Sequence, residues 1–381
     1  MKFSCTQDNL SQGLQIVSHI ATKNISLPIL SNVLIKIQNK ELKLITTNLE
    51  IAIVCKVRAK VEEDSDYTVP SQLFNEYISV ISGNRVDVES KTDGILISTD
   101  DDKTVIKGNK SADFPLIPYL EKNNFYGILM DNFKASLQQV LFAVSKNEAR
   151  PELSGVLFHF NSEYKPGYLV CAATDSYRLA EKGIKLIIDG KYSQTEKKII
   201  VPTRVLQEVL RIMSIFRDEV DENPPLEITV ADNQIMFSYG SVEIISRLIE
   251  GQYPDYRGII PQNFKTTINF TVSDWVRRIK AASFFSNIGI NGVQVSFKSG
   301  ADQKAIFNST NGQLGEHTSQ TLCQIVGEDN QILINYRYLL DGLSNLGSEE
   351  ATLKLISPES PCVLESKDKK DYLYIIMPIK Q

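Results

Sequence analysis

The chain alternates between two hydrophobic periods. Segments in which apolar residues occupy every second position, among them 32–37, 155–160 and 292–297, predict half-buried β-strands of antiparallel sheets. Other segments carry apolar residues at intervals of three and four, which predicts amphipathic helices. These helices cover 71–82, 131–146, 203–217, 273–283 and 335–346. Together the two periods predict an α+β fold.

The same succession of elements occurs three times. In each copy a short strand leads into a helix, two alternating strands follow, and a further strand leads into a second helix. Val33, Val156 and Val293 are equivalent landmarks, 123 and 137 residues apart in a chain of 381 residues. Loose alternation of helices and strands is the alternative explanation, but a constant order at these spacings favours three homologous domains.

Extended segments that contain proline end the first two copies, at 111–118 and 251–261. Such segments are typical of domain junctions. The sequence therefore predicts an N-terminal domain over 1–124, a central domain over 125–253 and a C-terminal domain over 254–381.

Residue types at the helix starts add local detail. Asp8, Asp131 and Ser273 stand just before helical periods, which predicts that they are N-caps that accept a hydrogen bond from a free backbone N–H. Pro70 and Pro202 suit helix starts, because the missing N–H of proline costs nothing there.

The net charge of the chain and its distribution over the helices restrict which binding partners can be expected. The 41 Lys and Arg against 46 Asp and Glu give a net charge of −5, which excludes a polybasic nucleic-acid binder. The five helices named above sum to +4, so any attraction to phosphate comes from local segregation of charge. Taken alone, the positive charge of these helices is explained equally well by the charged side chains that solvent-exposed helix surfaces ordinarily carry. The basic residues on these helices are Lys134, Lys146, Arg204, Arg211, Arg217, Arg277, Arg278, Lys280 and Arg337.

Five cysteines are scattered along the chain without a C-x-x-C pair, so a disulfide framework is not expected and a reducing compartment fits better. The N-terminal segment lacks the apolar stretch of a signal peptide, and no apolar run approaches ~18 residues. We therefore expect a soluble, cytoplasmic protein.

Catalytic signatures are missing from the sequence. It contains three histidines and none of the motifs H-E-x-x-H, G-x-S-x-G, G-x-G-x-x-G or G-x-x-x-x-G-K-[ST]. The acidic runs at 100–102 and 218–222 are more typical of solvated turns than of metal sites. The sequence predicts a protein that is not an enzyme and that needs no metal or cofactor.

Several segments resemble one known family. LPILSNVLI at 27–35, ADFP at 112–115, ATDSYRLA at 173–180, YPDYRGIIP at 253–261 and YIIMPI at 374–379 are similar to segments of the bacterial sliding clamp, the beta subunit of the DNA polymerase III holoenzyme. The resemblance extends over the whole chain and fits the three-fold repeat.

The resemblance implies three DNA-clamp domains, each with two helices on antiparallel sheets, and a head-to-tail homodimer that closes into a six-domain ring around duplex DNA. It implies a processivity factor that slides on DNA without sequence preference and tethers the replicative polymerase, the clamp loader and other proteins through a peptide-binding pocket. A scaffold that does not encircle DNA, or a hydrolase with an unrecognised site, is the alternative.

The family's pocket for partner peptides lies between the second and third domains. Matched by position, its residues here are Leu153, Thr174, Ser176, Tyr177, Arg178, Leu179, Pro254, Ile259, Asn335, Tyr338, Ile375, Ile376, Met377, Pro378 and Ile379. The apolar members fit a hydrophobic core equally well. The chain departs from the family at Ser176, where glycine is common, and at Gly258, where a basic residue is common.

The resemblance also implies contacts with DNA and between subunits. The loop residues Lys23, Asn24 and Arg150 match basic loops of the family, and we expect them near DNA together with the helix residues Lys134, Arg204, Arg211, Arg277, Arg278 and Lys280. Phe284 and Phe285 match the family's apolar subunit junction, and their partners would be Thr104, Val105 and Ile106 of the other subunit.

Overall fold

The computed structural model describes residues 1–21, 26–118, 120–121, 125–147, 149–216, 224–287, 289–368 and 371–380. The chain divides into two compact units, each built from several segments. Unit 1 comprises Met1–Asp131, Leu186–Gln194 and Arg204–Leu248, and unit 2 comprises Asn132–Lys185, Thr195–Thr203 and Ile249–Gln381. The predicted central domain thus contributes to both units.

Unit 1 contains two antiparallel sheets, of five strands in the order β5-β1-β7-β8-β9 and of eight strands in the order β10-β15-β16-β17-β4-β3-β2-β6. The strands are β1 (Lys2–Thr6), β2 (Asn32–Gln38), β3 (Glu41–Thr47), β4 (Ile51–Val57), β5 (Lys60–Glu63), β6 (Ser65–Pro70), β7 (Arg85–Lys91), β8 (Gly94–Ser98), β9 (Lys103–Lys107), β10 (Phe125–Ile128), β15 (Leu226–Val230), β16 (Gln234–Tyr239) and β17 (Val242–Arg247).

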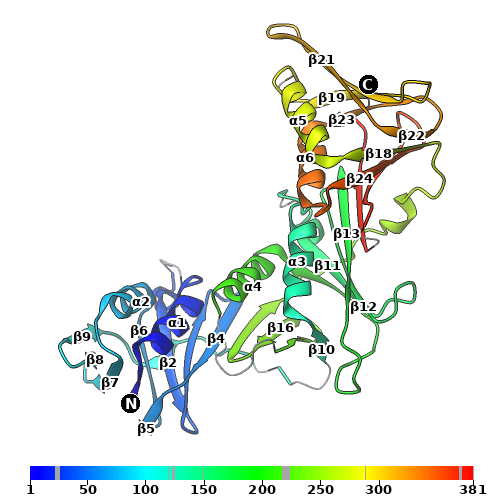
Figure 1. Ribbon diagram of the computed structural model, residues 1–381. Coiled ribbons are helices and arrows are strands. Elements are labelled where there is room, and N and C mark those ends of the chain that lie inside the picture. Colours follow the sequence, from blue (N-terminus) through cyan, green and yellow to red (C-terminus); the bar gives the residue numbers. More distant parts are fainter. Residues whose placement is uncertain are drawn as a thin grey trace. The chain divides into compact units, whose positions relative to one another are not determined.

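The helices of unit 1 are α1 (Gln7–Ser18), α2 (Ser71–Val80) and, from its second residue, α4 (Thr203–Ile215), and short 3₁₀ turns lie at Pro28–Ser31 and Ser111–Asp113. Figure 1 shows α1 and α2 side by side, and α1 packs against β1, β3 and β4 while α2 packs against β2 and β6. Leu10, Leu14 and Val17 on α1 are fully buried, as the helical period requires.

Unit 2 contains a nine-stranded sheet in the order β14-β11-β12-β13-β26-β25-β24-β18-β22 and a four-stranded sheet in the order β21-β20-β19-β23. The strands are β11 (Gly155–Phe160), β12 (Tyr168–Thr174), β13 (Arg178–Lys185), β14 (Lys197–Pro202), β18 (Thr266–Thr271), β19 (Gly292–Lys298), β20 (Lys304–Asn311), β21 (Gly315–Leu322), β22 (Gln324–Gly327), β23 (Asn330–Asn335), β24 (Glu350–Leu355), β25 (Cys362–Ser366) and β26 (Tyr372–Ile376).

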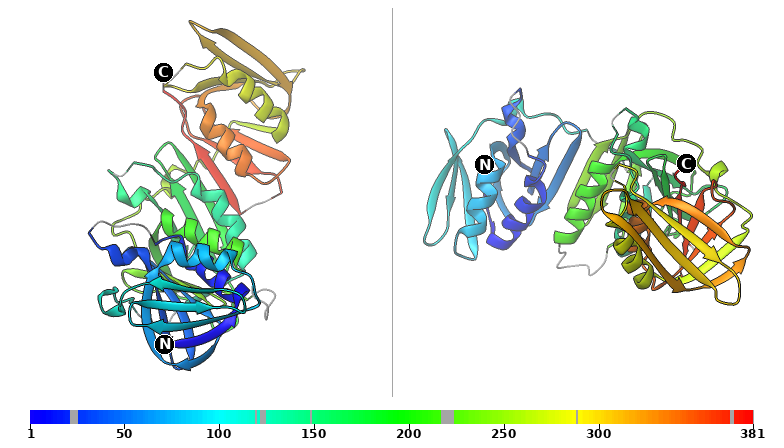
Figure 2. Two further views of the ribbon diagram at one scale, coloured as in Figure 1. Left: turned by 90° about the vertical axis from the view of Figure 1, so that its left-hand side faces the viewer. Right: turned by 90° about the horizontal axis from the view of Figure 1, so that it is seen from above.

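The helices of unit 2 are α3 (Met130–Leu141), which begins at the end of unit 1, α5 (Val272–Ser283) and α6 (Tyr336–Asn345), with 3₁₀ turns at Pro151–Leu153 and Arg257–Ile259. Figures 1 and 2 show α5 (yellow) and α6 (orange) next to each other, and both helices contact strands of the four-stranded sheet. The described residues thus contain six α-helices on antiparallel sheets, which confirms the predicted α+β fold.

Both large sheets run through the predicted domain junctions. In unit 1, β17 of the second repeat pairs with β4 of the first, and Val242 lies opposite Cys55. In unit 2, β13 of the second repeat pairs with β26 of the third, and Leu179 lies opposite Ile375. Each pairing joins two repeats by main-chain hydrogen bonds. The hydrophobic periods in the sequence do not reveal which strands of different repeats pair.

The helices α2 and α4 begin at Ser71 and Thr203, as predicted, whereas the other predicted helix starts are wrong by one or two residues. The helices α1 and α5 begin directly after their strands, with Thr6 and Thr271 at the N-cap position. The predicted caps Asp8, Asp131 and Ser273 lie inside the first turn instead. The reason is that the last strand residue already has the extended conformation that an N-cap needs.

The predicted charge of the helices also needs correction. Because α3 ends at Leu141, Lys146 is not part of it, and Arg217 lies outside the described residues. The helix α1, which the charge sum left out, carries Asp8 and no basic residue. The six helices together are therefore close to neutral, and net positive charge remains on α4 and α5.

A buried carboxylate joins α4 to α1 within unit 1. Glu208 is only 9% exposed, and its carboxylate oxygens lie 2.6 Å from Nδ1 of His19 and 2.9 Å from Nε of Arg211. Arg211 in turn donates to the carbonyls of Gln15 and Ile16, at 3.2 and 2.7 Å. Since carbonyls in the last turn of a helix lack partners within it, Arg211 caps α1 from the neighbouring repeat.

This cap makes Glu208 a stability determinant. The change Glu208→Ala should lower the free energy of unfolding by about 2 kcal/mol, because it leaves the guanidinium of Arg211 partly buried without its carboxylate. The matched control is Glu50→Ala, which removes the exposed partner of Arg204 and should change stability by less than about 0.5 kcal/mol. Urea unfolding followed by circular dichroism measures both, and equal effects would contradict the role given to Glu208.

Candidate functional site

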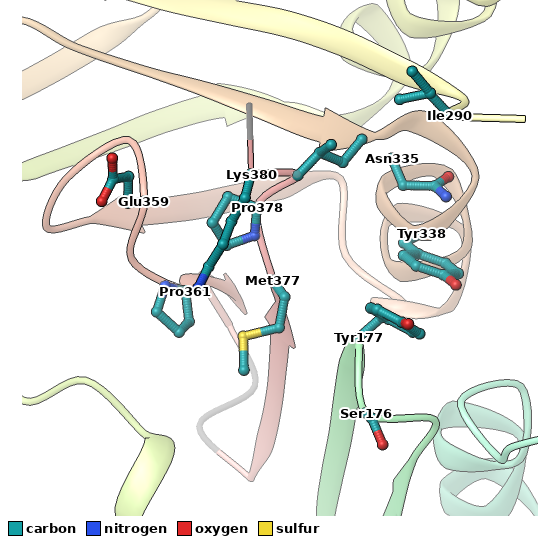
Figure 3. A pocket seen from close by; sticks show the side chains of 11 residues that line it. Ser176, Tyr177, Ile290, Asn335, Tyr338, Glu359, Pro361, Met377, Pro378 and Lys380 are labelled. Carbon is teal, nitrogen blue, oxygen red and sulfur yellow. The ribbon is translucent and has the colours of Figure 1, made fainter. Parts of the chain in front are cut away.

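A cavity of about 760 Å³ opens on the surface of unit 2. Figure 3 shows side chains around it from the turn before β13, from α6 and from the C-terminal segment after β26. Tyr177 and Tyr338 lie together on one side, Pro361 lies on the other, and Met377 stands between them. The lining residues are Ser176, Tyr177, Ile290, Asn335, Tyr338, Glu359, Pro361, Met377, Pro378, Ile379 and Lys380.

The turn between β12 and β13 presents Tyr177 to this cavity. The carboxylate of Asp175 accepts hydrogen bonds from the backbone N–H groups of Tyr177 and Arg178, both at 3.0 Å. The hydroxyl of Thr174 accepts from the N–H of Ser176 at 3.1 Å. Ser176 has a φ of 77°, a left-handed conformation that favours glycine, so these side chains hold a strained turn. Tyr177 remains 63% exposed.

The C-terminal segment forms a further part of the cavity wall, next to Tyr177. The N–H of Met377 donates to the carbonyl of Tyr177 at 2.9 Å, and the N–H of Ile379 donates to the carbonyl of Leu333 at 2.8 Å. The side chains of Met377, Pro378 and Ile379 are half-buried. The segment is therefore fixed at two points while its apolar side chains stay accessible.

Arg178 lies next to the cavity and connects its elements. Its Nε donates to Asp175 at 3.0 Å and its Nη1 to Asp341 of α6 at 2.6 Å. Its Nη2 donates to the carbonyl of Phe142 at 2.7 Å, and the guanidinium lies 4.6 Å from the ring centre of Tyr338. Burial acts to lower the pKa of Arg178, but the neighbouring acceptors outweigh it and the pKa lies above its usual value. Arg178 thus positions Tyr338 rather than lining the cavity.

Seven of the fifteen predicted pocket residues line the cavity: Ser176, Tyr177, Asn335, Tyr338, Met377, Pro378 and Ile379. Leu153, Leu179 and Ile375 belong to a buried hydrophobic cluster, and Ile376 is also fully buried. Thr174 and Arg178 are engaged in the turn, Pro254 is half-buried and Ile259 is 41% exposed. A direct role of these eight in ligand binding stays a prediction.

Four lining residues were not predicted from the sequence: Ile290, Glu359, Pro361 and Lys380. Ile290 precedes β19, and Glu359 and Pro361 lie in the turn between β24 and β25. A turn residue carries no periodic signal, so only the pairing of these strands brings it to the cavity.

Both arginines of α5 share one carboxylate. Arg277 lies 2.7 Å and Arg278 lies 3.0 Å from the carboxylate oxygens of Asp274. Burial acts to raise the pKa of Asp274, but hydrogen bonds from Thr321 and from both arginines outweigh it and lower the pKa to about 2. Asp274 is therefore ionised at neutral pH and partly neutralises this helix, while Lys280 is exposed.

Other predicted DNA-facing residues are also paired. Arg204 lies 3.2 Å from Glu50, and both side chains are mostly exposed. Arg150 lies 3.2 Å from Glu152 and donates to the hydroxyl of Ser176 at 3.2 Å, so it lies beside the cavity of unit 2. Arg211 is engaged in capping α1, and Lys134 is half-buried on α3. The predicted residues Lys23 and Asn24 lie outside the described residues.

The residues predicted for the subunit junction lie at sheet edges and helix ends. Strand β9, which contains Thr104, Val105 and Ile106, is the last strand of its sheet. Val105 is 57% exposed, whereas Ile106 is buried in its own unit. Phe284 is 74% exposed just after α5, and Phe285 stacks on His317 with ring centres 5.9 Å apart.

The described part of the chain was compared with the side-chain clusters of metal sites and with membrane-spanning helices. Its residues contain no group of three His, Cys, Asp or Glu side chains arranged to hold a metal ion. All five cysteines are free. No helix in the described segments has the length and apolar character needed to cross a bilayer.

Comparison with known proteins identifies the family. The chain matches the N-terminal domain of the DNA polymerase III beta subunit over residues 1–118, its central domain over 128–255 and its C-terminal domain over 257–380. The chain belongs to the DNA polymerase III beta subunit family. The family is that of the beta sliding clamp, a processivity factor without catalytic activity, which agrees with the absence of catalytic motifs in the sequence.

Relatives match along their full length. The beta sliding clamp of Streptococcus pneumoniae R6 is 29% identical over 99% of both chains, and that of Staphylococcus epidermidis RP62A is 26% identical over 100% of this chain and 99% of its own. The sliding clamp of Bacillus subtilis has the same fold, with a TM-score of 0.90, 24% identity and coverage of 100% of this chain and 99% of that chain.

Proposed function

We propose that two copies of this chain pair head to tail into a closed ring around duplex DNA, in the cytoplasm, and that the ring tethers polymerases through the cavity of unit 2. Three domains with limits at 1–124, 125–253 and 254–381 would then supply six domains to the ring. The observation that carries the proposal is that each unit has a sheet that ends in a strand paired on one side only and flanked by exposed apolar side chains. These strands are β9 in unit 1 and β21 in unit 2.

Both end strands lie beside apolar side chains that need a partner. Val105 on β9 and Phe284 after α5 are exposed, and His317 of β21 stacks on Phe285. Pairing β9 of one copy with β21 of another would satisfy two open backbone edges and bury these side chains. The lysines at both ends of β9 also suit Glu316 on β21. Because the two surfaces differ, each copy offers both, and two copies can close a ring.

Removing the apolar anchors should therefore separate the subunits. The double change Phe284→Asp and Phe285→Lys should give a folded monomer with half the mass of the parent protein in light scattering. Phe284→Asp alone should weaken the dimer without disturbing the fold, since Phe284 is exposed in the single chain. The control Ile188→Asp replaces an exposed apolar residue of unit 1 and should remain a dimer. A stable dimer with both phenylalanines replaced would refute this junction.

Direct attraction to DNA should be weak. The chain carries a net charge of −5, its helices are nearly neutral, and Arg204, Arg277 and Arg278 each have a carboxylate partner. Contacts with phosphates carry no sequence information. Retention on DNA would then come from linkage of a closed ring around the duplex, and sliding follows because no contact fixes a register.

Retention by a ring that is closed around DNA and binding by electrostatic attraction to phosphates respond differently to the salt concentration. Binding through six or more phosphate contacts loses ~10³ or more in affinity between 50 and 200 mM salt. Protein loaded on nicked circular DNA should co-elute with the circle in high salt and dissociate once the circle is cut to a linear molecule. Neutralising Arg204, Arg277 and Arg278 should reduce loading but leave retention on intact circles unchanged. Persistence on cut DNA in high salt would favour a conventional binding surface, or a scaffold that does not encircle DNA.

The cavity of unit 2 suits a short peptide with apolar side chains. Met377 offers a flexible thioether, and Tyr177 and Tyr338 offer rings with polar tips, a combination typical of peptide-binding surfaces. The replicative polymerase, the clamp loader and other replication or repair proteins would carry such a segment. One cavity per subunit would let the ring hold different partners in turn.

The methionine gives a direct test of this pocket. Met377→Ala should weaken binding of a C-terminal peptide of the replicative polymerase by about tenfold or more in calorimetry, because it removes a central apolar contact. Deleting residues 377–381 should abolish binding and leave the dimer intact. Ile188→Ala, which shortens an exposed side chain in unit 1, is the matched control. Unchanged affinity after the deletion would place the peptide site elsewhere.

A further inference from the structure

The cavity of unit 2 continues beyond the segment after β26. A second hollow of about 360 Å³ lies next to it and shares Glu359, Ile379 and Lys380 with it. Side chains of the C-terminal segment therefore separate the two spaces. The second hollow is lined by Gln294, Gln331, Ile332, Leu333, Pro358, Glu359, Ile379 and Lys380.

One wall of this second hollow is a sheet edge. Strand β23 is the last strand of the four-stranded sheet among the described residues. Its register with β19 places Leu333 opposite Gln294 and Gln331 opposite Ser296. The next pair along, Tyr336 and Asn291, is joined by a backbone hydrogen bond of 2.8 Å.

In an antiparallel sheet, the pairs of opposite residues alternate between hydrogen-bonded and non-hydrogen-bonded pairs. The hydrogen bond between Tyr336 and Asn291 therefore shows which residues of β23 point their N–H and C=O groups toward β19 and which point them away from it. Ile334 and Ile332 face β19, whereas Leu333 and Gln331 direct their backbone groups toward the open side. The hydrogen bond from the N–H of Ile379 to the carbonyl of Leu333, at 2.8 Å, agrees with this assignment. The C-terminal segment thus makes a first strand-like hydrogen bond to β23. Within the described residues, the segment does not continue this pairing along the strand.

The rest of this edge carries polar side chains, and the N–H of Gln331 already has a partner within the chain. The N–H of Gln331 donates to the side chain of Asn330 at 2.9 Å, and the side chain of Gln294 donates to that of Gln331 at 3.2 Å. Glu359 and Lys380 are exposed and bring one charge of each sign. By the alternation, the carbonyl of Gln331 faces the hollow beside these side chains. Such a surface suits extended main chain with polar side chains rather than a buried apolar group.

We propose that the residues flanking the peptide in the main cavity extend along the open edge of β23 and pair with it as an added strand. This inference rests on the proposed peptide-binding function of the main cavity. The occupant is the same partner segment, because the two spaces share Glu359, Ile379 and Lys380. Main-chain hydrogen bonds supply the added affinity and tolerate many side chains. Because Ile379 already occupies the carbonyl of Leu333, the added residues pair with the edge beyond it, at the carbonyl of Gln331.

The test compares peptides of different length on the unaltered dimer. The probe is a synthetic segment from the C-terminus of the replicative polymerase catalytic subunit, made in its short form and with about three residues added at either end. Calorimetry should show that extension at one end lowers the dissociation constant by about tenfold, whereas extension at the other end changes nothing. Methylation of the backbone nitrogens in the effective extension should remove the gain, since the methyl group replaces the donor.

Two protein variants separate backbone from side-chain effects. Gln331→Pro places a ring on the open edge without removing a hydrogen bond to β19, and it should abolish the gain from extension while the short form binds normally. Gln331→Ala keeps the edge and should preserve the gain. If the proline variant fails to fold, the methylated peptides on the unaltered protein still decide the question.

Each outcome points to one conclusion. Equal affinities for all three peptides overturn the added strand and leave the main pocket standing. A gain that survives both methylation and Gln331→Pro also overturns it, because side chains then supply the contact. Failure of the short form to bind overturns the proposed pocket and the extension together.

Discussion

Satisfaction of backbone groups at sheet edges is the constraint on which the rest of this structure depends. An open edge exposes N–H and C=O groups that seek a partner. The chain closes two of its edges internally, by pairing β17 with β4 and β13 with β26, so that sheets run through the junctions between repeats. Of the end strands that remain in the described sheets, β9, β21 and β23 are those to which we assign partners. Under the proposals made above, assembly and recognition would both follow from one property of the backbone.

The pairing of β13 with β26 also builds the cavity of unit 2. It places Arg178 opposite Ile376, so the turn that carries Tyr177 meets the segment that follows β26. Arg178 extends this connection to α6 through Asp341 and to the end of α3 through the carbonyl of Phe142. Elements far apart in the chain are thus held at fixed positions around a surface whose apolar side chains remain half-exposed. Such a rigid frame reduces the entropy lost when a flexible peptide binds.

Charge has a more restricted role than composition first indicates. Arginines that would face DNA are paired with Glu50 and Asp274, and Arg211 serves as a helix cap. A protein that must move along DNA gains from weak and uniform attraction, because strong phosphate contacts would slow it. The proposed closed ring would separate retention on DNA from affinity for it, so the modest charge of α4 and α5 is compatible with the proposal.

The sequence by itself determined the α+β class, the three-fold repeat and the family, because hydrophobic periods and motifs such as ATDSYRLA are local properties of the chain. It placed helix starts within one or two residues, and it predicted Tyr177, Tyr338 and Met377 at the cavity. Only the tertiary structure decided that Leu179 and Ile375 are core, that Glu359 and Lys380 line the cavity, and that Arg204 pairs with Glu50. These outcomes depend on long-range strand pairing and side-chain partners, which leave no periodic signal in the sequence.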